Sequence, residues 1–169
     1  KKNFNSVLII GMGLIGSSLS RAIYKNHLSD NVCGIDTNKK VIKKCEELNL
    51  LLKIDTNINN YKQQFDLIFI CTPLGTYKEI FSSLNKFVSQ PTLVTDVGST
   101  KVSAIQDFKE QVTNTNIQFL PSHPIAGLEK SGPEYGIANL FENRFCIITP
   151  INKNDSFIDR VTDMWKNIG

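Results

Sequence analysis

The chain reads Ser6-Val-Leu-Ile-Ile-Gly-Met-Gly-Leu-Ile-Gly-Ser17 near its beginning. The apolar run Val7–Ile10 predicts a buried strand, and a helix is expected from Leu14 to about Tyr24. Glycines follow the spacing G-x-G-x-x-G. The first allows a tight turn, the second lets a pyrophosphate approach the backbone, and the third lets the helix pack on the strand. The helix N-terminus offers free N–H groups and a positive dipole end. The stretch therefore predicts a dinucleotide site made by Gly11, Gly13, Leu14, Ile15 and Gly16.

An acidic residue supports this interpretation. Asp36 ends a second expected strand and follows Gly16 by 20 residues. At that position a carboxylate accepts hydrogen bonds from the adenosine ribose hydroxyls and repels a 2′-phosphate. The next residue is Thr37 rather than an arginine, although two lysines come soon after it. We therefore expect NAD rather than NADP, bound in part by Asp36 and Thr37. The alternative is a glycine-rich turn that only packs a helix on a sheet.

Strand-like and helix-like segments alternate along the whole chain. Further strands are expected at residues 31–36, 50–54, 66–72, 92–96, 117–120 and 145–149, and further helices at 38–48, 77–88, 102–112 and 155–167. Continuous apolar strands joined by helices are typical of a parallel sheet covered on both faces. We predict one α/β dinucleotide-binding domain over residues 1–169, a doubly wound, mostly parallel Rossmann-type sheet with helices on both faces. Residues 55–64 are expected to form a loop or a poor helix. The longest irregular stretch, 122–144, is expected to be functional.

The composition excludes several classes of protein. A hydrophobic fraction of 41% and a charged fraction of 21% are typical of a globular protein. The net charge of +3 is small and the basic residues are scattered, which argues against nucleic acid or a membrane surface as a partner. The apolar runs are too short to cross a bilayer, and no signal pattern is visible. We therefore expect a cytoplasmic protein.

Four cysteines lie far apart in the sequence, at positions 33, 45, 71 and 146. Their spacing matches no metal-binding or redox motif, and three of them fall inside apolar strand-like runs. We expect reduced, buried thiols rather than disulfides, and we expect no metal site.

Three polar segments follow later strands and indicate the chemical site. They are Cys71-Thr-Pro73, Asp96-Val-Gly-Ser-Thr-Lys101 and Ser122-His-Pro-Ile-Ala-Gly-Leu-Glu-Lys-Ser-Gly132. Ligands in open α/β sheets bind outside the carboxyl ends of the strands, so all three should border one crevice. Cys71, Thr72 and Pro73 are therefore expected beside the cofactor, although Pro73 could be a simple strand stop.

His123 is the candidate base, because histidine exchanges protons near neutral pH and this one lies in a loop at a ligand edge. The other histidine, His27, is expected to be a solvated or helix-capping residue. Ser99 either bonds a substrate hydroxyl or the nicotinamide, or caps the helix that begins near Val102.

These segments resemble the prephenate/arogenate dehydrogenases in order and spacing. The matching blocks are the glycine motif, Cys71-Thr-Pro73, Asp96-Val-Gly-Ser-Thr-Lys101 and His123-Pro-Ile-Ala-Gly-Leu-Glu-Lys-Ser-Gly-Pro133. The resemblance runs over essentially the whole chain. The resemblance implies NAD-dependent oxidative decarboxylation of prephenate or arogenate in tyrosine biosynthesis. Hydride would pass from the ring carbon that carries the 4-hydroxyl to C4 of the nicotinamide. His123 would take the hydroxyl proton, Ser99 would hold the hydroxyl and the nicotinamide in register, and Glu129 would shape or gate the substrate pocket.

Two departures from the family pattern affect the expected function. Leu128 stands where the family commonly has threonine or serine, which concerns substrate choice and feedback by tyrosine. Family members also carry a C-terminal helical domain that forms a homodimer and supplies basic residues for the substrate carboxylates. We expect this chain to be a fragment without that domain, weakly active or inactive alone. The alternatives are an NAD-sensing or interaction module without catalysis, and another β-hydroxyacid-type dehydrogenase or imine reductase.

Overall fold

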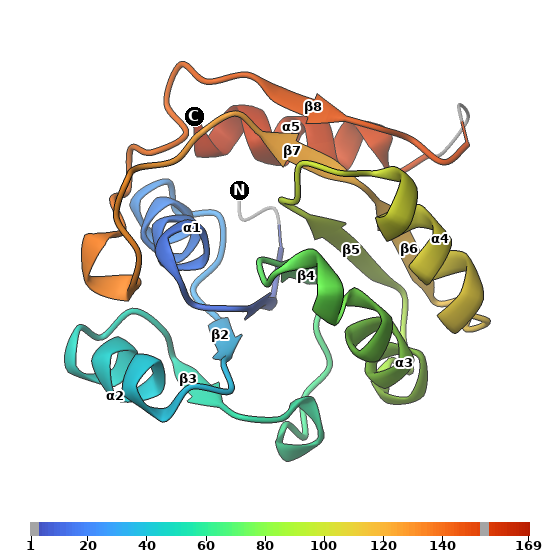
Figure 1. Ribbon diagram of the computed structural model, residues 1–169, viewed down its shortest axis with the longest axis horizontal. Helices are drawn as coiled ribbons and strands as arrows, with labels where there is room; N and C mark the ends of the chain where they lie inside the picture. The colour runs from blue at the N-terminus through green and yellow to red at the C-terminus, as the bar shows by residue number, and fades with distance from the viewer. Residues whose placement is uncertain (1–3, 153–155) are drawn as a thin grey trace.

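A computed structural model describes residues 4–152 and 156–169, and a six-stranded parallel sheet forms its centre (Figure 1). The strands are β1 (Val7–Ile10), β2 (Val32–Ile35), β3 (Lys53–Asp55), β4 (Leu67–Ile70), β5 (Thr92–Asp96) and β6 (Ile117–Leu120). Their spatial order is β3-β2-β1-β4-β5-β6, and every neighbouring pair is parallel. The winding direction reverses between β1 and β4, so a ligand crevice is expected outside the carboxyl ends of these two strands.

Helices cover both faces of the sheet, as predicted (Figure 1). The helices on one face are α1 (Leu14–Lys25), α2 (Lys39–Glu47) and α5 (Ile158–Ile168), and those on the other are α3 (Tyr77–Phe87) and α4 (Val102–Gln111). Successive side chains of a strand point to opposite faces. In β1, Val7 and Ile9 pack with α1 and α5, whereas Leu8 and Ile10 pack with α3 and α4. This two-sided burial explains why the central strands β1 and β4 are apolar at every position.

Several element boundaries differ from the predicted ones. β3 begins at Lys53 rather than at residue 50, and residues 55–64 contain one 3-10 turn, η1 (Ile58–Asn60). The last helix begins at Ile158; the predicted start, residue 155, lies outside the described residues. The start of α2 is as expected, because Asn38 caps it by accepting the Lys40 N–H at 2.9 Å.

The region after β6 corrects two expectations. Residues 122–144 are not wholly irregular, because they contain β7 (Ser122–Pro124) and a 3-10 turn, η3 (Pro133–Tyr135). The strand expected at 145–149 exists as β8 (Cys146–Ile148), but it pairs antiparallel with β7 in a separate two-stranded sheet. An apolar run predicts a strand but not its partner, since strand preference depends on the tertiary surroundings.

No helix in the described ranges has the length and apolar character needed to cross a membrane.

Candidate active site

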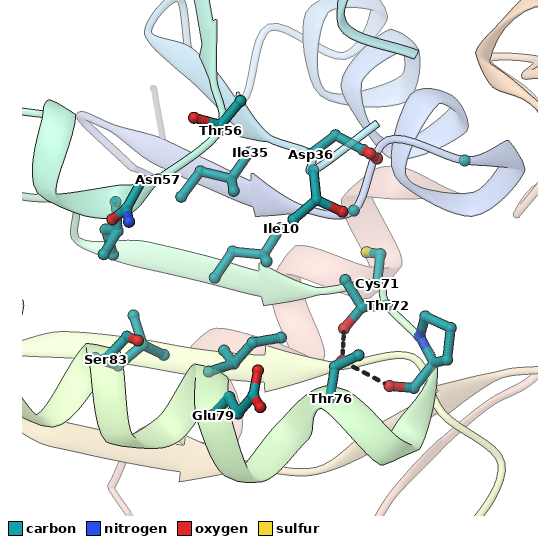
Figure 2. Close-up of a pocket in the computed structure, with 17 residues that line it drawn as sticks. Ile10, Ile35, Asp36, Thr56, Asn57, Cys71, Thr72, Thr76, Glu79 and Ser83 are labelled. Atoms are coloured by element: carbon teal, nitrogen blue, oxygen red, sulfur yellow. Dashed lines mark hydrogen bonds between the residues drawn. The ribbon is translucent and has the colours of Figure 1, made fainter. Parts of the chain in front are cut away.

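A pocket of about 680 Å³ opens where β1 and β4 end, at the expected crevice (Figure 2). Seven of the residues predicted to bind the cofactor line it: Gly11, Gly13, Asp36, Thr37, Cys71, Thr72 and Pro73. The predicted residues Leu14, Ile15 and Gly16 begin α1 instead and do not line the pocket wall. A volume of this size lies within the range of small-molecule sites.

The three motif glycines have different geometric roles. Gly11 has a φ of +95°, which side chains rarely adopt, and a Cβ there would lie 2.8 Å from the Cys71 carbonyl oxygen. A Cβ on Gly16 would overlap the Gly11 carbonyl oxygen, so this glycine lets α1 pack on the loop. A Cβ on Gly13 would have nothing within 4 Å. The chain itself therefore has no need of glycine at 13, and the open space there fits a group that approaches the backbone from the pocket.

Asp36 is held in a fixed orientation at the end of β2. One carboxylate oxygen accepts the Met12 N–H at 2.9 Å, and the other accepts the Asn38 N–H at 2.9 Å. These bonds tie the carboxylate to the glycine loop on one side and to the start of α2 on the other. The side chain is partly exposed and lines the pocket (Figure 2), so it is available to ribose hydroxyls.

Other residues that line the pocket were not predicted from the sequence. Thr56 and Asn57 follow β3, and Thr76, Glu79 and Ser83 face them from the opposite side, along α3 and the turn before it (Figure 2). The Thr76 hydroxyl bonds both the Thr72 hydroxyl and the Pro73 carbonyl at 2.7 Å, which closes the turn after β4. Thr56 and Asn57 could have been predicted from the sequence, because ligands bind outside the carboxyl ends of parallel strands and these residues follow β3. No sequence signal pointed to the face of α3.

His123 lies on β7 directly after Ser122, which is buried. Because successive side chains of a strand point to opposite faces, the His123 side chain points away from that of Ser122. The His123 side chain is partly exposed, and its Nδ1 lies 3.4 Å from the Val97 carbonyl oxygen. A carbonyl oxygen can only accept a hydrogen bond, so this contact favours the neutral tautomer with its proton on Nδ1. In that tautomer Nε2 is the nitrogen that can accept a proton, as a general base must.

The other predicted chemical residues, Ser99 and Glu129, lie in exposed loops. Ser99 follows β5, Glu129 follows β7, and neither they nor His123 line the large pocket. Lys101, not Ser99, occupies the N-cap position of α4, so the capping alternative for Ser99 is wrong. His27 is exposed and has a φ of 53° just after α1, in agreement with a solvated residue that ends the helix.

A buried ion pair at the end of β5 was not anticipated from the sequence. The Asp96 side chain is fully buried at 0% exposure, and Lys101 Nζ lies 2.6 Å from its Oδ2. The Tyr77 hydroxyl donates to the same oxygen at 2.8 Å, and burial together with this carboxylate raises the pKa of Tyr77. Burial lowers the pKa of Lys101 while Asp96 opposes that shift.

All four cysteines are free thiols, of which Cys33 and Cys45 are buried and the other two partly exposed. Although Cys71 is partly exposed as a residue, desolvation of its sulfur and the Asp96 charge raise the pKa of its thiol, so it is a thiol rather than a nucleophilic thiolate at neutral pH. Across the described residues, no group of three or more His, Cys, Asp or Glu side chains is arranged to hold a metal ion.

Comparisons with known proteins agree with this geometry. Residues 19–169 match the family described as prephenate dehydrogenase, nucleotide-binding domain. The chain is 32% identical to a cyclohexadienyl dehydrogenase of Zymomonas mobilis over 98% of its own length and 56% of that protein. It is 35% identical to a prephenate dehydrogenase of Bacillus subtilis over 89% of its length and 41% of that protein.

Among solved structures, a prephenate dehydrogenase from A. aeolicus in complex with hydroxyphenyl propionate and NAD+ superimposes with a TM-score of 0.88 and 31% identity. The match covers 98% of this chain and 57% of that one. The chain thus spans about half the length of the relatives it matches. Family match and shared fold lead to one conclusion: this chain belongs to the prephenate dehydrogenase family and corresponds to its nucleotide-binding domain.

Proposed function

We propose that this chain binds NAD in the pocket of about 680 Å³ and contributes the catalytic base of a prephenate or arogenate dehydrogenase. The cofactor part rests on the glycine loop and Asp36. Gly13 leaves room for a pyrophosphate, and the oriented Asp36 carboxylate suits ribose hydroxyls while opposing a 2′-phosphate. The A. aeolicus relative, solved with NAD+, supports this assignment.

The reaction that fits the family is an oxidative decarboxylation. In this reaction the protein must take one proton from the substrate hydroxyl and later return it. When bound, NAD supplies the hydride acceptor. The C–H bond at the hydroxyl-bearing ring carbon breaks with loss of hydride, and His123 Nε2 takes the hydroxyl proton. The C–CO₂ bond then breaks, its electrons make the ring aromatic, and the ring oxygen recovers a proton from His123. Since aromatisation drives the reaction, the protein mainly orients the reactants and supplies one base.

The observation that carries this proposal is the contact between His123 Nδ1 and the Val97 carbonyl, which leaves Nε2 free as an acceptor. Ser99 is proposed to hold the substrate hydroxyl beside the nicotinamide, and Glu129 to shape the substrate pocket. Ile147 is paired directly opposite His123 in the two-stranded sheet of β7 and β8 and is 54% exposed, so an apolar surface is available next to the base for the substrate ring. A cytoplasmic homodimer acting in tyrosine biosynthesis completes the proposal.

The test compares two histidine variants of the complete gene product. His123→Asn should lower prephenate- or arogenate-dependent NADH formation by about 10²- to 10⁴-fold, the usual effect of losing a general base. NAD affinity should stay within about twofold of the wild type, because His123 does not line the cofactor pocket. His27→Asn is the matched control: its left-handed backbone suits asparagine, so activity should be unchanged.

The outcomes separate the proposed function from its alternatives. Full activity of His123→Asn would show that His123 is not the base. A wild-type protein that binds NAD but oxidises neither substrate would favour an NAD-sensing or interaction module. The same assay on the 169-residue chain alone tests the expectation that it turns over weakly without further residues.

A further inference from the structure

The Asp96–Lys101 ion pair has no role in the cofactor pocket, because neither residue lines it. Both side chains are nevertheless withdrawn from water, with exposures of 0% for Asp96 and 12% for Lys101. A buried ion pair often adds no stability compared with apolar residues of the same size, because desolvation opposes the attraction. The role of such a pair is therefore better sought in the groups that it holds in place than in stability.

The pair binds both backbone polar groups of one residue, Ser122. Asp96 Oδ1 accepts the Ser122 N–H at 3.0 Å, and Lys101 Nζ donates to the Ser122 carbonyl oxygen at 2.8 Å. The Ser122 hydroxyl is also engaged, since it donates to the Asp96 carbonyl at 2.7 Å and accepts from Trp165 Nε1 at 3.2 Å. Every polar atom of Ser122 is thus bonded, and β7 is fixed to the end of β5 at this point.

The next residue along β7 is His123, and its ring contacts the same segment, residues 96–97. Nδ1 contacts the carbonyl of Val97, which directly follows Asp96. The backbone on which His123 stands and the acceptor that sets its tautomer are therefore both attached to residues 96–97. A shift of β7 relative to β5 would change the position of the ring and its hydrogen bond together.

We propose that the buried Asp96–Lys101 pair is a positioning device for His123, acting through the two backbone groups of Ser122 that it binds. The effect of the ion pair on catalysis rests on the proposed function of His123. Its effect on the position of the His123 ring does not depend on that function. Charged partners suit this task because hydrogen bonds to ionised groups are shorter and stronger than neutral ones. Lys101 is a positioning residue in this scheme and does not contact the substrate.

Lys101→Met tests the proposal, because it keeps the aliphatic chain and removes the bonds to Asp96 and Ser122. Asp96 would keep three donors, namely the Tyr77 hydroxyl and the N–H groups of Gly98 and Ser122, so folding should be retained. Lys78→Met is the matched control, since Lys78 pairs with a carboxylate at 3.2 Å on the exposed surface. If Lys101→Met does not fold, Lys101→Gln, which keeps a neutral donor, is measured against the same criteria.

The first readout is imidazole ¹H–¹⁵N NMR at about pH 8.5, two units above the ordinary histidine pKa. The chain has only two histidines, so His27 is an internal reference. In Lys101→Met the His123 signals should shift or show a changed tautomer, while those of His27 stay in place. Signals of His123 identical to those in Lys78→Met would overturn the proposal, whether or not the protein is a dehydrogenase.

The second readout is steady-state kinetics of the complete gene product. Misplacing a catalytic group by about 1 Å costs up to about 10²-fold in rate, so kcat should fall roughly 10- to 100-fold with KM for the substrate changed less than about threefold. A raised KM with unchanged kcat would instead indicate direct contact of Lys101 with substrate and would refute a positioning role. If the wild type oxidises neither substrate, the proposed function fails and the NMR result alone decides the positioning.

Discussion

Gly13→Ala offers a sharp test of how the glycine loop works, because the structure assigns no internal reason for glycine at that position. A Cβ there would meet nothing within 4 Å, and the backbone φ of −76° is open to alanine. Alanine is a poorer N-cap than glycine, by roughly 0.5–1 kcal/mol. It also restricts the unfolded chain, which stabilises the protein by about 0.4–1 kcal/mol. The two effects nearly cancel, so the free energy of unfolding should be almost unchanged.

The cofactor affinity should respond very differently. If a pyrophosphate lies against Gly13, the added methyl group occupies its place, and we expect the Kd for NAD to rise about tenfold or more, equivalent to at least about 1.4 kcal/mol. Calorimetric titration with NAD and a thermal melt of the unliganded protein measure the two quantities separately. The melting temperature should move by less than about 4 °C, since 1 kcal/mol corresponds to about 2–4 °C at this size.

Gly16→Ala is the matched control, with the same added methyl group three residues later. Its Cβ would overlap the Gly11 carbonyl oxygen, so the loop must shift, and overpacking of this kind costs about 1–3 kcal/mol. Its melting temperature should therefore fall by roughly 2–12 °C. A Gly13→Ala protein that binds NAD as well as the wild type would refute the assignment of the space at Gly13 to the cofactor. A large loss of stability in Gly13→Ala would refute the geometric argument itself.

Two further predictions concern charge. Asp36→Ser should raise the ratio of NADP to NAD affinity about tenfold or more in paired binding titrations, because the carboxylate that repels a 2′-phosphate is removed; an unchanged ratio would mean that Asp36 does not face that position. Burial raises the pKa of Cys45 from 9.0 to about 11, so the folded protein keeps a proton that the unfolded chain releases between these pH values. The free energy of unfolding should consequently fall by about 2 kcal/mol as the pH rises through this window. Denaturant titrations across this pH range should show a smaller fall in the free energy of unfolding for Cys45→Ala than for the wild type. An equal fall in the two proteins would contradict the raised pKa of Cys45.

Much of the cofactor site was predictable because its requirements are local. Gly11 needs a backbone conformation that only glycine adopts readily, and Gly16 must admit a neighbouring carbonyl within one loop. Asp36 ends a strand at a distance along the chain that one βαβ unit sets. The opposite wall of the pocket was not predictable in this way. Glu79 and Ser83 belong to the polar side of α3, and their place depends on how that helix packs across β4.

The sequence alone determined the alternating α/β architecture, the glycine loop, and the candidates His123 and Ser99, because strand and helix periodicity and strand-end position are carried by neighbouring residues. Only the tertiary structure decided that the strand near residue 147 pairs with the segment holding His123 instead of joining the main sheet. It alone also showed that Asp96 and Lys101 are buried together and bind Ser122. The physical reason is that burial and hydrogen bonding join residues far apart in the chain, and no local pattern of side chains records which of them will meet.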